Sequence, residues 1–242
     1  MLKEFKVDLH IHTCLSPCGD NSMVPTKIIA RAKRGNLHAI GISDHNATEN
    51  VLAVREAGLR EGVPVLGGIE MTSEEEIHVL AFFDDHRDLA EMQDLIYENL
   101  EGENDEEAWG EQIIVDSNDR ITGSNKRLLI GATGLSIDRI VDHVHKLGGI
   151  AIASHVDKEA FSITSQLGFI PQFLELDALE LSPHASNSRI SYRDSGFPLL
   201  TFSDAHYLDD LGSSFTTLML AETTVEELKK AITETEGRQI IL

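Results

Sequence analysis

The sequence predicts an α/β protein in which helices cover a largely parallel β-sheet. Short apolar runs of strand length recur along the chain, and helix-like stretches separate several of them. Alternating strands and helices indicate parallel pairing, because a parallel strand can be reached only by a crossover connection. The repeated order suits both a closed barrel and an open sheet, and the pattern leaves both forms available. At 242 residues, one large domain is expected.

The expected strands are apolar over most of their length, as in a sheet buried on both faces. They lie at 5–9, 38–43, 63–69, 78–83, 149–154, 176–182 and 197–203. Helices are expected at 25–35 and 48–62, which end at Gly35 and Gly62. A further amphipathic helix is expected at 136–149, with Ser136 as N-cap and one apolar face made of Ile137, Ile140, Val141, Val144 and Leu147.

Residues 84–135 interrupt this rhythm and indicate an insertion. The acidic stretch "ENLEGENDEEAWGE" precedes "QIIVDSNDRITG", which predicts two strands joined by an Asn-Asp turn. A solvated helical face is the favoured interpretation of the acidic run, and a lid over a functional site is the alternative.

Composition and charge exclude several classes of protein. A formal net charge of −21 disfavours a surface that coats nucleic acid, although a small phosphorylated substrate remains compatible with it. No run approaches the roughly 20 apolar residues of a membrane span. The N-terminal segment has no signal-peptide features, so we expect a cytoplasmic protein. In a reducing cytoplasm, Cys14 and Cys18 are expected to be free thiols, or one of them a thiolate ligand.

Metal-ligating residues gather where the predicted strands end. His10 and His12 are two apart, so both rings project from the same side of an extended segment, and Asp204 and His206 repeat this spacing. Single candidates follow three other strands, at His45, Glu70 and His155. In a parallel barrel the C-terminal strand ends meet at one mouth, where these side chains would converge.

The mixture of imidazoles and carboxylates favours a cluster of several ions over a closed structural zinc site. A carboxylate such as Glu70 can bridge two ions. Two ions roughly 3.5 to 4 Å apart can activate water and stabilise the attacking and leaving oxygens of an in-line displacement. This chemistry suits phosphate esters.

The segments "DLHIHTCLSP", "ISDHN", "GIE", "ASH" and "SDAH" occur in this order between residues 8 and 206. They resemble the motif pattern of the polymerase and histidinol phosphatase (PHP) family of metal-dependent phosphoesterases. The resemblance implies a distorted TIM-like barrel of seven βα units, formed by residues 1–242 as a single catalytic domain with an acidic insertion at about 84–135. It implies two to three divalent ions of manganese, zinc or iron, held by the seven residues that the strand ends also select, namely His10, His12, His45, Glu70, His155, Asp204 and His206.

Two further ligands rest on the resemblance. His78 opens its predicted strand instead of closing it, so strand geometry does not place it at the mouth. The family usually supplies a ligand from the first loop, where this sequence offers Cys18 or Asp20. We favour Asp20, because a carboxylate suits manganese, iron and zinc alike, whereas a thiolate biases a site toward softer ions.

The implied function is hydrolysis of a phosphate monoester or diester by metal-activated water. Its substrate would be a nucleotide, an oligonucleotide end or a small phosphorylated metabolite. Glu70, Asp204 and His206 are expected to act in catalysis, and the expected substrate contacts are Lys158, His184, Arg189 and Arg193. The alternatives are a metal hydrolase of C–N bonds and a non-catalytic PHP-type module that binds phosphorylated ligands or a replication partner.

Overall fold

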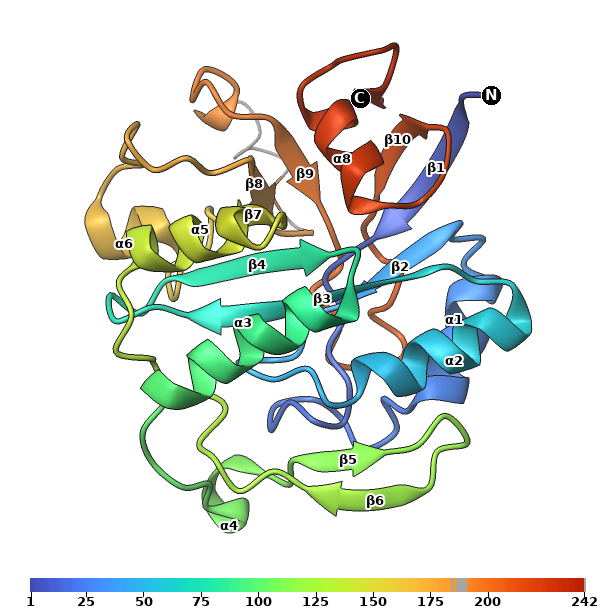
Figure 1. Ribbon diagram of the computed structural model, residues 1–242, viewed down its shortest axis with the longest axis vertical. Coiled ribbons are helices and arrows are strands. Elements are labelled where there is room, and N and C mark those ends of the chain that lie inside the picture. Colours follow the sequence, from blue (N-terminus) through green and yellow to red (C-terminus); the bar gives the residue numbers. More distant parts are fainter. Residues whose placement is uncertain (184, 186–190, 242) are drawn as a thin grey trace.

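The computed structural model describes residues 1–183, 185 and 191–241. In these residues, nine strands form one curled sheet in the order β11-β10-β1-β2-β3-β4-β7-β8-β9 (Figure 1). The strands are β1 (Lys3–Asp8), β2 (Ala39–Ile42), β3 (Val65–Thr72), β4 (His78–Phe83), β7 (Ile150–Ala153), β8 (Ala178–Leu181), β9 (Leu199–Thr201), β10 (Thr216–Leu220) and β11 (Gln239–Ile241). The helices are α1 (Pro25–Arg34), α2 (Val51–Glu61), α3 (His86–Asn99), α4 (Glu106–Trp109), α5 (Ile137–Lys146), α6 (Ile163–Leu167) and α8 (Val225–Ile232).

The sheet is mixed, not parallel throughout as the sequence predicted. The pairs β1-β2, β2-β3, β7-β8 and β8-β9 are parallel, but β4 runs antiparallel to both β3 and β7. Only residues 73–77 connect β3 to β4, and this link is too short for a crossover. Two unexpected strands, β10 and β11, extend the sheet by antiparallel pairing beyond β1.

The sheet curls so that its edge strand β9 approaches β1 at one rim. A parallel bridge joins Ile11, just after β1, to Ala205, just after β9. The N–H of His12 donates to the Ala205 carbonyl at 3.0 Å, and the Ala205 N–H donates to the His10 carbonyl at 3.1 Å. The result is an α/β architecture of TIM-like kind, with its rim formed by the segments that follow β1 and β9.

One hydrophobic cluster fills the concave side of the curled sheet, and a second packs the helices on its outer side. The Phe82 ring lies in the first cluster, where two neighbouring strands carry glycine. A Cβ at Gly41 would lie 2.7 Å from this ring, and one at Gly68 would lie 2.5 Å from it. Glycine is therefore needed at both positions. The inner cluster also contains Phe5, Leu66, Ile152, Phe202, Leu218 and, from α8, Leu228.

The predicted helices form close to their expected positions. Gly62 ends α2 with a left-handed φ of 72°, as its sequence position predicted, whereas Gly35 after α1 stays right-handed. Ser136 occupies the N-cap position of α5 but makes no side-chain cap hydrogen bond. No helix in the described part of the chain is long and apolar enough to cross a bilayer.

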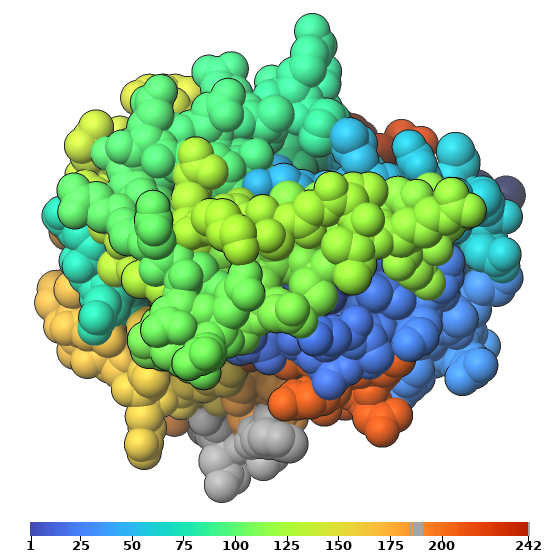
Figure 2. Space-filling model, turned by 90° about the horizontal axis from the view of Figure 1, so that it is seen from below, coloured from blue at the N-terminus to red at the C-terminus, as the bar shows by residue number. Residues whose placement is uncertain are grey.

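The predicted hairpin within residues 84–135 is confirmed as β5 (Ile113–Val115) and β6 (Ile121–Ser124). It packs on the first loop, where the Ile113 N–H donates to the Cys14 carbonyl at 2.9 Å, and Figure 2 shows it as a yellow-green band beside the blue N-terminal segment. The buried Asn50 side chain holds the hairpin by donating to the Ile113 carbonyl at 3.0 Å and accepting from the Val115 N–H at 2.9 Å. The acidic run is largely exposed but forms only the single-turn α4.

Candidate metal centre

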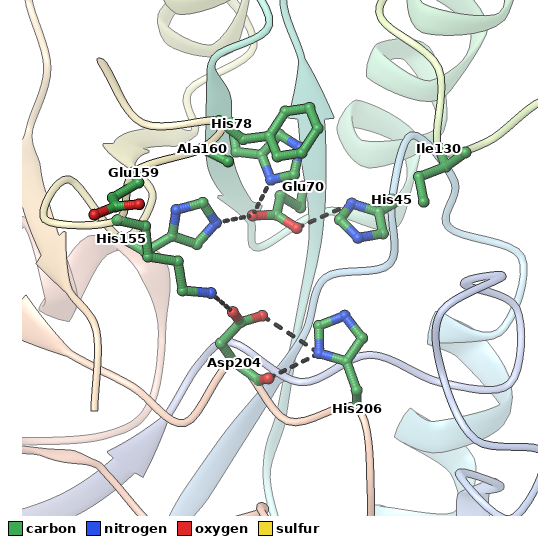
Figure 3. Close-up of a pocket in the computed structure, with 11 residues that line it drawn as sticks. His45, Glu70, His78, Ile130, His155, Glu159, Ala160, Asp204 and His206 are labelled. Carbon is green, nitrogen blue, oxygen red and sulfur yellow. Dashed lines mark hydrogen bonds and ion pairs between the residues drawn. The ribbon is translucent and has the colours of Figure 1, made fainter. Parts of the chain in front are cut away.

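The side chains selected at the strand ends converge at one end of the curled sheet. His10 and His12 follow β1, His45 follows β2, Glu70 lies in the last part of β3, His155 follows β7, and Asp204 and His206 follow β9. The parallel strands end at the same rim, so these residues meet although 196 positions separate the first from the last. Figure 3 shows five of them around a common pocket, namely His45, Glu70, His155, Asp204 and His206.

The Glu70 carboxylate lies at the centre of the cluster and is fully buried. Its Oε1 is 3.1 Å from His78 Nδ1, 3.3 Å from His10 Nε2 and 3.4 Å from His155 Nε2. Its Oε2 is 3.0 Å from His45 Nδ1 and 3.4 Å from His12 Nε2. The two oxygens of one carboxylate therefore face different sets of imidazoles, as a bridge between two ions requires.

A second carboxylate, Asp204, closes the cluster beside the first pair of histidines. The Nε2 atoms of His10 and His12 are 3.2 Å apart, and Asp204 Oδ1 lies 3.3 Å from each. His206 Nδ1 is 3.6 Å from the same oxygen. Asp204 and His155 both have positive φ angles, of 50° and 27°. Such backbone strain is common where a side chain must be held for function.

His78 reaches the cluster because β4 runs antiparallel to β3. The first residue of an antiparallel strand lies at the rim where the preceding parallel strand ends, and His78 pairs with Thr72 at this rim. Its side chain contacts Glu70, which places this candidate ligand within the cluster. The strand-end argument missed His78 because it assumed that all strands run in one direction.

The first loop brings Cys18 to the cluster, whereas the favoured Asp20 points elsewhere. The Asp20 carboxylate accepts the Ser22 N–H at 2.8 Å in a local Asx turn. This hydrogen bond and the charge of Lys27 lower the pKa of Asp20, and no imidazole contributes. The Cys18 side chain is exposed, and it lies near enough to His45 and His206 for their imidazoles to lower its pKa.

The ionisation of the cluster residues reflects their burial and close contact. Burial alone would raise the pKa of Glu70, but the positive charges of His78, His10 and His45 hold it well below its usual range. Burial together with the neighbouring His206 and His45 keeps the pKa of His12 well below its usual range. The first-loop thiol is shifted too: despite desolvation, His45 and His206 lower the pKa of Cys18 to about 6. Glu70, His12 and Cys18 are therefore disposed to be deprotonated, which is the form that binds metal, whereas neighbouring carboxylates raise the pKa of His10 and His45, which would release protons on binding an ion.

The residues present fit divalent ions. In three sets of three residues, the possible ligand atoms all lie within 4.8 Å of one another. The sets are His12, His45 and His206; His10, His12 and Glu70; and His45, Glu70 and His78. Three buried atoms in this region have no hydrogen-bond partner within the described residues, namely His45 Nδ1, Glu70 Oε2 and His155 Nδ1. Unpaired buried polar atoms are costly, and a bound cation would satisfy the first two where they face each other.

Glu180 was not selected from the sequence, although it is the main support of His10. Its carboxylate is fully buried, with Oε1 and Oε2 at 2.9 and 3.0 Å from His10 Nδ1. Oε2 also accepts the His155 N–H at 3.0 Å. A metal-binding histidine usually gives its second ring N–H to such a partner, which fixes the tautomer. The available signal was a carboxylate between two leucines in the apolar run "ALEL".

Asp44 supports His12 in a similar way through a hydroxyl. The Ser16 hydroxyl donates to Asp44 Oδ1 at 2.7 Å, and its oxygen lies 3.0 Å from His12 Nδ1. The same carboxylate accepts the Thr13 N–H at 2.7 Å and the Thr13 hydroxyl at 2.8 Å. The "SDH" segment thus contributes both a candidate ligand and a residue that orients another.

The four predicted substrate contacts fall in three different positions. Lys158 lines the pocket at its rim, and its ammonium group pairs with Asp204. Arg193 is exposed and is not among the described residues that line the pocket. His184 and Arg189 lie outside the described residues.

A sequence profile of the PHP domain matches residues 8–170. The chain belongs to the PHP domain family. Among curated relatives, the phosphoribosyl 1,2-cyclic phosphate 1,2-diphosphodiesterase of Eggerthella lenta is 33% identical over 66 residues, which are 27% of this chain and 24% of that protein. The 3′,5′-nucleoside bisphosphate phosphatase of Chromobacterium violaceum is 32% identical over 66 residues, which are 27% of this chain and 22% of that protein. These matches thus span about a quarter of each relative.

Solved structures share the fold of most or all of the chain. The lesion-specific endonuclease PfuEndoQ of Pyrococcus furiosus superposes with a TM-score of 0.72 at 20% identity, covering 99% of this chain and 58% of that one. An amidohydrolase of Chromobacterium violaceum, solved with sulfate and without metal, gives a TM-score of 0.59 at 19% identity, covering 85% of this chain and 89% of that one. At these identities the similarity concerns the fold.

Proposed function

We propose that this PHP protein hydrolyses a phosphate monoester or diester with water activated at a centre of two to three divalent ions. The observation that carries the proposal is the position of Glu70, whose two carboxylate oxygens face separate groups of imidazoles inside a buried cluster. Divalent ions at such a centre would lower the pKa of bound water and offset charge on phosphate oxygens. The phosphodiesterase and phosphatase named among the relatives support this reaction class.

The proposed ligand groups follow the contacts in the cluster. His10, His12, Glu70 and Asp204 would hold one ion, while His78 and His155 would join Glu70 at a second. His45 and His206 would form a third with His12, and the exposed Cys18 from the first loop lies near these imidazoles. Imidazole and carboxylate donors suit manganese, iron and zinc, so the cluster does not select among them by donor type alone.

Three residues are proposed to act closest to the reacting phosphate. Glu70 would contribute a carboxylate oxygen to more than one ion site, and Asp204 would combine ion binding with its contact to Lys158. The His206 side chain keeps 23% of its surface exposed and lines the pocket, so it can contact a bound ester. Lys158 is 41% exposed at the rim, where its ammonium group can transfer from Asp204 to a substrate phosphate.

A phosphate-release screen over nucleotides, sugar phosphates and diesters, with manganese, zinc and iron each supplied, tests the proposal. We expect His12→Ala and Asp204→Ala to lose both bound metal and activity while keeping the circular dichroism spectrum of the wild type. His143→Ala, on α5 outside the cluster, is the matched control and should retain both. Release of phosphate by the wild type and both cluster variants at equal rates would contradict the proposal.

Two other functions are outcomes of the same screen. Turnover of amide substrates without ester hydrolysis would favour a C–N bond hydrolase. Tight binding of phosphorylated ligands without any turnover would favour a non-catalytic module. We place the protein in the cytoplasm, in keeping with the free thiols of Cys14 and Cys18.

A further inference from the structure

Phe161 has an unusual backbone conformation beside the metal centre. It lies between β7 and α6 with a φ of 56°, in the left-handed region that bulky residues seldom adopt. Its carbonyl accepts the His78 N–H at 2.9 Å. The next residue fixes the loop, because the Ser162 hydroxyl donates to the Lys158 carbonyl at 2.7 Å. Strain of this kind persists only where the surroundings enforce it, and it is frequent at functional sites.

The Phe161 ring forms part of the pocket wall directly above a candidate ligand. It stacks on His78 with ring centroids 4.7 Å apart and an interplanar angle of 18°. The residue is nevertheless 38% exposed and lines the pocket. One face of the ring is therefore covered by an imidazole, while other parts remain available to a bound molecule.

A second segment adds an apolar side chain to the pocket, which the Glu159 carboxylate also lines. Ile130, from the segment that follows the β5-β6 hairpin, faces the pocket, and Figure 3 shows it across the cluster from Glu159 and Ala160. The pocket has a volume of about 470 Å³, well within the range of sites for whole small molecules. The polar cluster forms the floor of the pocket, so a substrate phosphate would lie deep and its leaving group would lie between the side chains of Phe161 and Ile130.

We infer that Phe161 is a specificity-determining residue that stacks on the nucleobase of a mononucleotide whose phosphate is bound at the cluster. The inference rests on the proposed function, since it assigns the leaving group of that reaction. An aromatic ring accepts any base, because every base has a flat π-face. Lys158 is the single Lys or Arg that lines the pocket in the described chain, which favours a short nucleotide over a long polyanion.

The test compares two ligands that differ only in the base. Isosteric phosphonates of AMP and of ribose 5-phosphate, which hydrolysis cannot consume, are titrated into the metal-loaded protein by calorimetry. We expect the wild type to bind the AMP analogue about ten-fold more tightly than the ribose analogue. Phe161→Gly removes the ring and the strain, Phe161→Ala removes the ring alone, and Phe161→Trp keeps an aromatic ring. The glycine and alanine variants should lose the preference, and the tryptophan variant should retain it.

The controls separate base stacking from support of His78. Phe169→Gly removes an aromatic residue that is 62% exposed and does not line the pocket, and it should leave both affinities unchanged. Metal content is measured in every variant and should equal that of the wild type. Absence of a preference in the wild type, equal loss of both ligands, or loss of metal in Phe161→Ala would each overturn the inference. Base preference without any phosphate release would support the role of Phe161 and refute the proposed function. Turnover without base preference would support the proposed function and refute the role of Phe161.

Discussion

Replacement of Glu180 by glutamine tests how the metal centre is held in place. The wild-type carboxylate accepts from His10 Nδ1 through both oxygens and from the His155 N–H through Oε2, in a site closed to solvent. Glutamine has nearly the same shape but only one acceptor oxygen. The NH2 of the glutamine amide is itself a donor. It would therefore face at least one of the two N–H groups, His10 Nδ1–H or the His155 backbone N–H, that the wild-type carboxylate accepts from.

The expected loss is one charge-assisted hydrogen bond and the tautomer that it fixes. Removing such a partner of a metal ligand typically lowers metal affinity by about 10- to 100-fold. This factor corresponds to about 1.4 to 2.8 kcal/mol of binding free energy. It agrees with the roughly 1.5 to 3 kcal/mol of a hydrogen bond to a charged group. We expect Glu180→Gln to fall within this range, because the contacts of 2.9 and 3.0 Å are short and fully buried.

The assay is competition for zinc or manganese between the protein and a chromophoric chelator of known affinity. Glu175→Gln changes an exposed carboxylate in the segment before the same strand and should bind metal as the wild type does. Thermal unfolding of both variants without added metal separates lost affinity from lost fold. Wild-type affinity in Glu180→Gln, or an equal loss in Glu175→Gln, would refute the assignment of Glu180 as a positioning residue.

Three further outcomes are expected. In metal-free protein, the alkylation rate of Cys18 should rise with pH around a midpoint near 6, because the reactive thiolate forms above its pKa. Burial raises the pKa of Cys14 to about 12, so Cys14 should stay unmodified at neutral pH. Mass spectrometry of peptides after brief alkylation distinguishes the two thiols, and equal labelling would argue against the contacts of Cys18. Lys158→Ala should raise KM by about ten-fold through loss of a phosphate contact, while the exposed Lys126→Ala should not, as initial rates would show. Asn50→Ala should lower the free energy of unfolding by about 2 to 4 kcal/mol, because buried groups of the first loop and of the hairpin lose their hydrogen-bond partner. Urea titrations measure this change, and an unchanged unfolding midpoint would contradict it.

Much of the cluster could be predicted from strand ends alone. His45, Glu70 and His155 each follow or end an apolar run, and parallel strands bring such positions to one rim. His78 needed the family resemblance, because the strand-end argument did not use the short link before β4, which is the signal that β4 is antiparallel. Glu180 was overlooked because a carboxylate in the middle of a buried strand has its partner far away in the sequence.

The conformation of the loops could not be predicted from the sequence. Asp20 and Cys18 are both plausible ligands by spacing, and the structure separates them through local contacts. A Cβ at Gly19 would lie 2.5 Å from the Thr13 carbonyl oxygen, so the loop takes a tight path that only glycine permits. Along this path the Asp20 carboxylate accepts the Ser22 N–H, while the exposed Cys18 lies near enough to His45 and His206 for its pKa to be lowered. The positive φ of Phe161 likewise follows from its surroundings and has no signal in the sequence.

The central claim is a centre of several divalent ions bridged by Glu70. Inductively coupled plasma mass spectrometry of protein purified without chelators measures ions per chain directly, in the wild type and in Glu70→Gln. The position of both Glu70 oxygens among separate imidazoles predicts at least two ions in the wild type and the loss of at least one in the variant. One ion or none in the wild type, or an unchanged count in Glu70→Gln, would contradict the account.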